Sequence, residues 1–248
     1  MVGDHILRLH FRSQLLAQAP NGYNEWQVVT EEKAIPATEA AIIICDMWDN
    51  HWSRGAVERV NAMVPRMNEV VGAARDKGMT IVHAPSETME FYAEHPARKR
   101  VLVVPRIEPP PDHEHDDPLL PVDDSDGGTD TGETSWYKAW TRQHPGIEIK
   151  DDDFISDDGG EVYTLLKQES IGQVLIMGVH TGMCVLNRSF GIKQMVKWGV
   201  NIALVRDLTD ALYNPAKLPY VSHDEGTRLI IGYIEKFWCP TILSKDLL

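Results

Sequence analysis

The sequence predicts an α/β fold, in which a mostly parallel, doubly wound (Rossmann-like) sheet forms the middle of a three-layer α/β/α sandwich. Two observations predict it. Short, β-branched apolar runs, typical of strands buried on both faces, recur along the 248 residues. Segments whose apolar residues are spaced as on one helix face lie between these runs, and such alternation produces a parallel sheet covered on both sides. We expect a single domain over residues 1–248.

The strands are expected from residue 40 onward. AAIIIC at 40–45 is apolar throughout, and QVLIMGV at 173–179 is apolar after its first residue, as buried parallel strands are. MTIVHA at 79–84 follows a glycine that ends the preceding helix, and VNIALV at 200–205 has the same character. Two shorter runs complete the predicted sheet, GIEIK at 146–150 and TIL at 241–243.

Four helices are expected between these strands, because apolar residues recur there at helical spacing. They cover about 60–74, 159–172, 182–198 and 222–237. Asp157 or Asp158 can cap the second helix, and Ser222 and Glu225 have capping-box spacing at the start of the fourth.

Two stretches lie outside this alternation. One is an N-terminal arm at about 1–37, and the other is an acidic, Pro/Gly-rich loop insertion at about 108–132. The loop has no periodicity and is expected to be a partly ordered excursion. Its histidines and aspartates could bind a cation weakly, although a solvated acidic loop is the usual meaning of such a run.

Composition excludes several classes of partner. The formal net charge of −13 disfavours nucleic acid and anionic membranes, and no stretch approaches the roughly 20 apolar residues of a membrane helix. Three cysteines, Cys45, Cys184 and Cys239, leave an unpaired thiol and lack CxxC spacing. We therefore expect a cytoplasmic protein, while a secreted form whose signal has been removed stays open.

Polar residues that can carry chemistry follow the predicted strands. In an open parallel sheet, ligands bind outside the carboxyl ends of the strands. Asp46, His83 and Lys150 fall at such ends, and His180 and Cys184 follow the strongest strand. A helix N-terminus and a nearby lysine would favour a thiolate. An aspartate could accept the thiol proton and return it to a leaving amine, which describes acyl transfer through a thioester.

Each of these residues also has an ordinary structural interpretation. A cysteine at a helix start is more often part of a core, so Cys184 alone proves little. Asp46 could be a turn residue, and Lys150 could be a solvated charge in the run KDDD. The hypothesis depends on all three falling at strand ends.

Four segments resemble the isochorismatase-like cysteine hydrolase superfamily, which includes nicotinamidases, carbamoylsarcosine amidases and ureidoacrylate amidases. They are AIIICDMWD, IEIK, MGVHTGMCV and VRDLTDAL, in family order, and the resemblance covers about 38–243. It implies that Cys184 is the nucleophile, that Asp46 is the general acid and base, and that Lys150 polarises the thiol and the site.

The resemblance further implies the geometry of the turn after the strongest strand. It places a cis peptide bond between Val179 and His180. The backbone N–H groups of His180 and Cys184 would then form the oxyanion hole, and such donors often make the largest catalytic contribution.

Because Cys184 is present, the resemblance favours cleavage of a C–N bond in a small amide, ureide or carbamoyl compound, without a cofactor. Three alternatives stay open. They are an isochorismatase-type enol-ether hydrolase in which Cys184 is incidental, a non-enzymatic binding descendant of the fold, and a thiol redox enzyme in which Cys45 approaches Cys184. The resemblance also implies a homo-oligomer.

Bulky residues after the first strand suggest an unusual pocket mouth. Substrate-binding candidates are Trp48, His83, Trp140 and Arg142. No metal is expected, although nicotinamidases bind a divalent metal through an Asp-x-His pair and a further histidine. The alternative metal set here is Asp49, His51 and His83, whose place in the chain differs from that site.

Overall fold

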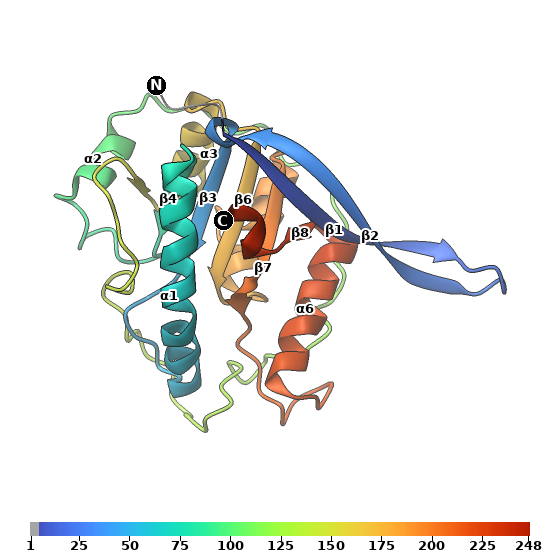
Figure 1. The fold of residues 1–248 in the computed structure, drawn as a ribbon. Coiled ribbons are helices and arrows are strands. Elements are labelled where there is room, and N and C mark those ends of the chain that lie inside the picture. Colours follow the sequence, from blue (N-terminus) through green and yellow to red (C-terminus); the bar gives the residue numbers. More distant parts are fainter. Residues whose placement is uncertain (1–4) are drawn as a thin grey trace.

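The computed structural model describes residues 5–248 of the chain. One eight-stranded sheet runs through the molecule in the order β2-β1-β8-β7-β6-β3-β4-β5 (Figure 1). Its strands are β1 (Ile6–Gln18), β2 (Asn24–Pro36), β3 (Ala40–Cys45), β4 (Thr80–Ala84), β5 (Phe154–Ile155), β6 (Gln173–Val179), β7 (Ile202–Asp210) and β8 (Thr241–Ile242). The helices are α1 (Arg54–Asp76), α2 (Pro96–Leu102), α3 (Gly159–Gln168), α4 (Cys184–Asn187), α5 (Ile192–Lys197) and α6 (His223–Phe237), with short 3-10 turns at Ala37–Glu39 and Ser244–Leu247.

Strands β3 to β8 pair in parallel, and the central ones are buried on both faces. Alternate residues of β3 enter opposite hydrophobic cores, Ile43 on one side and Ile42 and Ile44 on the other. Helix α1 packs into one core, and α3, α5 and α6 pack into the other. Figure 1 shows α1 lying across one face of the sheet. The predicted α/β sandwich with a mostly parallel sheet is confirmed. No helix within residues 5–248 is both long and apolar enough to cross a membrane.

The predicted strand at 146–150 is wrong. That segment is irregular, and the edge strand is β5, which begins four residues later and pairs with β4 through Val82 and His83. Glu148 donates its N–H to the Asn68 side chain instead of a strand (2.9 Å), and the chain turns at Lys150, whose carbonyl accepts from Asp153 N–H (3.1 Å). Apolar residues alternate with polar ones in GIEIK, but no neighbouring strand within residues 5–248 pairs with this segment, so it does not form a strand.

The predicted continuous helix at 182–198 is also wrong, because it is two short helices, α4 and α5. Arg188 leaves helical geometry with φ −60° and ψ 156°, and Gly191 donates to its carbonyl (2.7 Å). A Cβ on Gly191 would lie 2.8 Å from the Val185 carbonyl oxygen, so the tight turn requires a glycine. This break redirects the Arg188 side chain.

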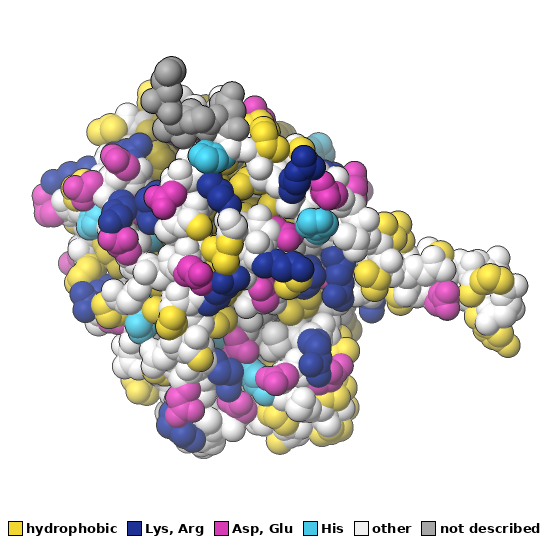
Figure 2. Space-filling model, in the orientation of Figure 1, with side chains coloured by type: hydrophobic (Ala, Val, Ile, Leu, Met, Phe, Trp, Pro, Cys, Tyr) yellow, Lys and Arg dark blue, Asp and Glu magenta, His cyan; other side chains and the backbone are white. Residues whose placement is uncertain are grey.

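The N-terminal arm is a long β-hairpin, which lies outside the strands predicted from the sequence. β1 and β2 pair antiparallel over their whole length, from Ile6↔Pro36 to Gln18↔Asn24. The half near the body buries Leu7, Leu9 and Phe11, and β1 joins the main sheet at Thr241 of β8. The far half projects from the body (Figures 1 and 2). Its exposed apolar side chains include Leu15, Leu16, Tyr23, Trp26 and Val28.

The acidic loop at 108–132 contains no helix or strand, and its side chains anchor it to the body. Asp117 accepts from Lys193 Nζ (2.8 Å) and from the Tyr233 hydroxyl (2.9 Å). Asp130 binds both terminal nitrogens of Arg59 on α1, at 2.9 and 3.0 Å. The described loop thus packs against α1, α5 and α6 through these side chains.

A charged network connects this loop to the sheet. The Nε nitrogen of Arg59 donates to Asp210 of β7 (2.8 Å), and His223 Nε2 lies 3.0 Å from the same carboxylate. The other ring nitrogen of His223 lies 3.0 Å from the Tyr213 carbonyl and 3.3 Å from Asp130. Both ring nitrogens therefore face acceptors, which suits a protonated imidazole.

Stability from this network is expected to fall as pH rises. Burial lowers the pKa of His223, but the hydrogen bond and charge of Asp210 outweigh it, so the net pKa is raised. Such a group stabilises the fold fully below its unfolded pKa and loses that contribution as pH rises through the folded pKa. At about pH 5.5 we expect His223→Gln to melt about 2–4 °C below the unmodified chain, with the gap narrowing towards about pH 8.5, in thermal unfolding by circular dichroism. A constant gap would show that the folded imidazole is neutral.

Candidate active site

The catalytic candidates Asp46 and Cys184 meet because they follow neighbouring strands. β3 and β6 pair in parallel up to Cys45↔Gly178. Gly178 has φ 114°, and a Cβ there would lie 2.0 Å from the Cys45 carbonyl oxygen, so only glycine allows this close approach. Asp46 leaves β3 with φ 45°. The two strand ends thus bring the carboxylate and the thiol to one edge of the sheet.

The Asp46 carboxylate is fully buried and held at both oxygens. Oδ1 accepts from the backbone N–H of Ser86 (2.7 Å), and Oδ2 accepts from Nε of Arg188 (3.0 Å). Burial raises the pKa of this carboxyl, and the Arg188 charge and the contacts with Cys184 and Ser86 oppose that rise. Asp46 is therefore a stronger base than an exposed carboxylate, and Arg188 holds it in position.

The Cys184 thiol lies beside Asp46 and is partly exposed to the cavity. Burial and the Asp46 charge raise its pKa, while Arg188 and the backbone N–H of His180 lower it. Helix α4 has only four residues, so it gives the thiolate little of the dipole support that a long helix would. At neutral pH the resting group is consequently a thiol that needs a base.

The turn between β6 and α4 aims backbone donors at this thiol. The peptide bond between Val179 and His180 is cis. In the part of the chain that the structure describes, neither the His180 nor the Cys184 N–H donates to another backbone carbonyl. The His180 N–H contacts the thiol and lowers its pKa. Neither N–H is thus engaged by the backbone of the described residues, and the His180 N–H lies at the sulfur.

Lys150 does not lie at a strand end, contrary to the prediction. It precedes β5, is exposed, and its ammonium pairs with Glu148. Its backbone N–H donates to Asp153 (2.7 Å). The cation beside Asp46 and Cys184 is Arg188, which sequence reasoning missed. Its position four residues after the cysteine was the available signal, since residues i and i+4 share a helix face.

A cavity of about 220 Å³ opens beside the thiol. Four tryptophans line it, together with His51, Glu87, Met183, Cys184 and Arg188 among others; the tryptophans are Trp48, Trp52, Trp136 and Trp140. Trp48 and Trp140 stack with ring centroids 4.0 Å apart, and Trp48 Nε1 donates to the Ser86 carbonyl (3.1 Å). The walls are flat and mostly apolar, which suits a small planar group.

Two buried polar atoms near this cavity have no hydrogen-bond partner within residues 5–248, namely Trp140 Nε1 and His180 Nε2. Burial, followed by the nearby charges of His51 and Arg59, lowers the pKa of His180. Burial likewise lowers the pKa of His51 to about 4. The lowered pKa values favour neutral imidazoles at both cavity-lining histidines.

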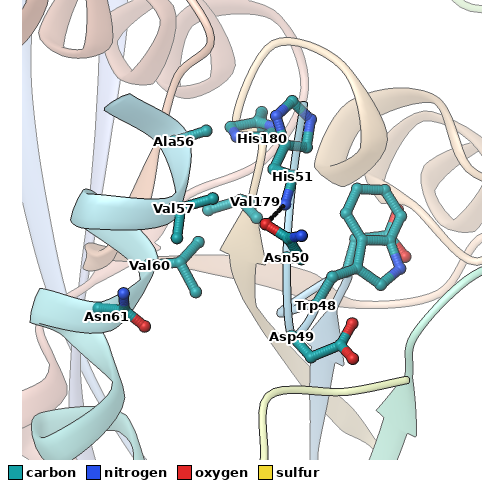
Figure 3. Close-up of a pocket in the computed structure, with 11 residues that line it drawn as sticks. Trp48, Asp49, Asn50, His51, Ala56, Val57, Val60, Asn61, Val179 and His180 are labelled. Carbon is teal, nitrogen blue, oxygen red and sulfur yellow. Dashed lines mark hydrogen bonds between the residues drawn. The ribbon is translucent and has the colours of Figure 1, made fainter. Parts of the chain in front are cut away.

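Figure 3 shows a smaller hollow between α1 and the segment from Trp48 to His51. Val57 and Val60 of α1 face it on one side, and Val179 and His180 on another (Figure 3). Its volume of about 10 Å³ approaches that of a single water, which is too small for a substrate. The tryptophan-walled cavity is the better ligand site.

The other predicted binding residues separate into two groups. Trp48 and Trp140 line the cavity. His83 is fully buried, with its ring nitrogens 3.0 Å from Gln143 Oε1 and 3.1 Å from Asp153 Oδ2. Arg142 is exposed near Phe91, with its guanidinium carbon 5.4 Å from the ring centroid. The structure therefore does not bring His83 or Arg142 to the cavity lining.

The alternative metal set is not brought together. Asp49 binds the N–H and hydroxyl of Thr141 (2.9 and 2.6 Å), His51 lies at the cavity, and His83 is occupied by its own partners. Within residues 5–248 no cluster of three or more His, Cys, Asp or Glu side chains could hold a metal ion. The donor set of a metal centre is thus absent from the described residues.

The Isochorismatase domain family matches residues 40–217 of this chain. The fold is similar to a cysteine hydrolase from Pseudomonas syringae pv. phaseolicola 1448A, at 14% identity and TM-score 0.55 over 86% of this chain and 92% of that one. It is also similar to an isochorismatase-like hydrolase from Alkaliphilus metalliredigens, at 14% identity and TM-score 0.49 over 84% and 94%. A search of the curated proteins found no match.

The family match covers most of the chain and includes both Asp46 and Cys184. It agrees with the eight-stranded sheet, in which the two residues follow adjacent strands. The resemblance drawn from the four sequence segments is confirmed. This chain belongs to the isochorismatase-like superfamily of hydrolases.

Proposed function

We propose that this protein is a cysteine-dependent hydrolase that cleaves a C–N bond in a small amide, ureide or carbamoyl compound. One observation carries the proposal: the buried Asp46 carboxylate adjoins the Cys184 thiol at a cavity walled by tryptophans. A thiol with a raised pKa beside a held carboxylate suits a nucleophile that is activated by a base during attack.

The first half-reaction forms a thioester. Asp46 accepts the thiol proton as the Cys184 sulfur bonds to the substrate carbonyl carbon, and the backbone N–H groups of His180 and Cys184 stabilise the oxyanion. The tetrahedral intermediate collapses, the C–N bond breaks, and Asp46 returns the proton to the leaving nitrogen. Ammonia or an amine departs, and the acyl group stays on sulfur.

The second half-reaction consumes one water. Asp46 accepts a proton from this water as its oxygen bonds to the thioester carbon. Collapse of the second intermediate breaks the C–S bond, and the proton passes to the sulfur. The products are a carboxylic or carbamic acid and the regenerated thiol. These steps require neither a metal nor a redox cofactor.

A substrate screen with chemical trapping tests this proposal. Probes would include nicotinamide, pyrazinamide, N-carbamoyl amino acids and small ureides, with ammonia release as the readout. Hydroxylamine added during turnover should convert the thioester to a hydroxamate, and mass spectrometry of the protein should show an acyl group on Cys184. The Cys184→Ala variant is the matched control. Enol-ether hydrolysis that persists in this variant would support the isochorismatase-type alternative instead.

We propose a cytoplasmic location, which three free cysteines support, and a small-molecule substrate as the partner of the site. The net charge of −13 supports the further proposal that neither nucleic acid nor a membrane surface is a partner.

We also propose that the protein forms a homo-oligomer through the hairpin arm. A projecting two-stranded hairpin is marginally stable alone, and this one exposes Leu15, Trp26 and Val28. β2 is an edge strand, so its outer backbone groups can pair with another strand. In a dimer with two-fold symmetry, the β2 strands of two chains would pair with each other.

Shortening the arm is expected to release monomers. Ser13 and Val29 are paired, so an Asn-Gly turn can replace residues 14–28 and close the hairpin near the body. Light scattering coupled to size-exclusion chromatography should give a multiple of 28.0 kDa for the full chain and a single chain mass for the shortened one. A monomeric full chain, or an unchanged multiple after shortening, would contradict the role of the arm.

A further inference from the structure

Arg188 is the cation closest to the proposed chemistry. Its Nε donates to Asp46 Oδ2 (3.0 Å), and its side chain is only 29% exposed. A second nitrogen, Nη1, lies 3.5 Å from Glu87 Oε1, and the guanidinium carbon lies 5.9 Å from the Trp48 ring centroid. The planar group is thus fixed between an inner carboxylate, an outer carboxylate and an aromatic face.

Asp46 needs such a cation to act as a base. A fully buried carboxyl without a counter-charge tends to stay protonated, and a protonated Asp46 could not take the Cys184 proton. The groups facing Asp46 are Cys45 of β3, Ser86 of the loop after β4, and Cys184 and Arg188 of the α4 segment. Arg188 is the positive group among them.

Lys150 is poorly placed for this task. It is exposed, precedes the edge strand β5, and pairs with Glu148. It is also absent from the residues that line the cavity, whereas Arg188 and Cys184 both line it. Arg188 lies where the chain leaves α4, and from there its side chain reaches Asp46 at the end of β3.

We propose that Arg188, in place of Lys150, is the positioning residue of this site: it holds Asp46 ionised and oriented towards the Cys184 thiol. Only the effect of Arg188 on turnover depends on the proposed function. The contact between Arg188 and Asp46 should also affect the pH at which the Asp46–Cys184 pair loses a proton, and this pH can be measured without any substrate.

The test is the pH profile of Cys184 alkylation by iodoacetamide, followed by peptide mass spectrometry so that Cys45 and Cys239 are counted separately. Asp46 and Cys184 titrate as a coupled pair, and alkylation requires the pair to have lost its first proton. Arg188→Met removes the cation that favours this loss. We expect the acid limb of the profile to move to higher pH by about 1–3 units. Arg188→Lys keeps the charge without the planar fork, and should recover part of the shift.

Two further variants make the result decisive. Lys150→Met should leave the profile in place. Arg98→Met controls for losing a partly buried arginine, because Arg98 is 13% exposed and pairs with Glu161 away from the cavity. It should reduce stability without moving the profile. A shift in Lys150→Met with none in Arg188→Met would overturn the assignment, and so would equal shifts in Arg188→Met and Arg98→Met.

These outcomes are separable from those of the proposed function. If the Arg188 shift is found but no amide is hydrolysed, the positioning role stands and the reaction is a different one. If amides are hydrolysed but the Arg188 shift is missing, the hydrolase stands and the positioning role fails. Once a substrate is known, Arg188→Met should lower kcat more than it raises KM, because the cation acts on the base and not on ground-state binding.

Discussion

Replacement of Cys184 by alanine is expected to lower kcat/KM for an amide substrate by about 10⁴–10⁶-fold. The sulfur forms the bond that defines the proposed mechanism, and no other thiol lining the cavity can replace it among the described residues. Cys184 is partly exposed, so losing its side-chain sulfur should cost little stability. Steady-state ammonia release and a thermal melt on the same preparation would measure both effects.

The matched control is Cys239→Ala, which removes a buried thiol far along the chain from the site and should preserve turnover. Cys184→Ser should also be nearly inactive, since Asp46 is a weak base for a hydroxyl of much higher pKa. Full activity in Cys184→Ala would show that the thiol is incidental. The enol-ether chemistry would then be the better description of the site.

Asp46→Asn is expected to have opposite effects on turnover and on thiol reactivity. Hydrolysis should fall by about 10²–10⁴-fold, because no base accepts the thiol proton and no acid protonates the leaving nitrogen. Alkylation of Cys184 near neutral pH should increase by roughly tenfold. The Asp46 charge raises the pKa of the thiol and the Arg188 charge lowers it, so loss of the Asp46 charge should lower the pKa of the thiol.

Iodoacetamide labelling and ammonia release on one protein sample measure this divergence. The change is nearly isosteric, and a carboxamide oxygen can still accept the Ser86 N–H that now binds Oδ1. A variant in which labelling and hydrolysis both fall would indicate that Asp46 matters for packing. A variant in which neither changes would remove Asp46 from the mechanism.

The positions of Asp46 and Cys184 at one edge of the sheet could be predicted from the sequence, because each follows a segment with a clear strand pattern. β3 and β6 are buried at every position, and all their residues except Gln173 are apolar. Parallel neighbours bring their carboxyl ends together whichever loops connect them. The predicted strand before Lys150 is wrong for the converse reason. The residues before it alternate like a strand, but pairing depends on a distant partner, and β4 pairs with Phe154 and Ile155 instead.

Arg188 and the arm escaped sequence reasoning for related reasons. Helical spacing in the sequence continues across Arg188, whereas the chain turns there through Gly191, which donates its N–H to the Arg188 carbonyl. The arm alternates Leu7, Leu9 and Phe11 against polar neighbours, which is a strand signal. This segment is predicted only as an arm, because it lies outside the alternation of strands and helices that begins at residue 40.

The proposed reacting groups and part of the cavity wall come from different parts of this chain. The proposed acid and nucleophile, Asp46 and Cys184, follow β3 and β6, whereas Gly127 of the acidic loop lines the cavity against Trp52. The neighbouring Gly128 sits so close to the Leu212 carbonyl that a Cβ would lie 2.1 Å from its oxygen. Since Asp130 and Asp117 fasten the loop independently of the catalytic pair, substitutions between these anchors can reshape the cavity and leave the reacting groups in place. Directed evolution towards a new amide should therefore begin in that loop.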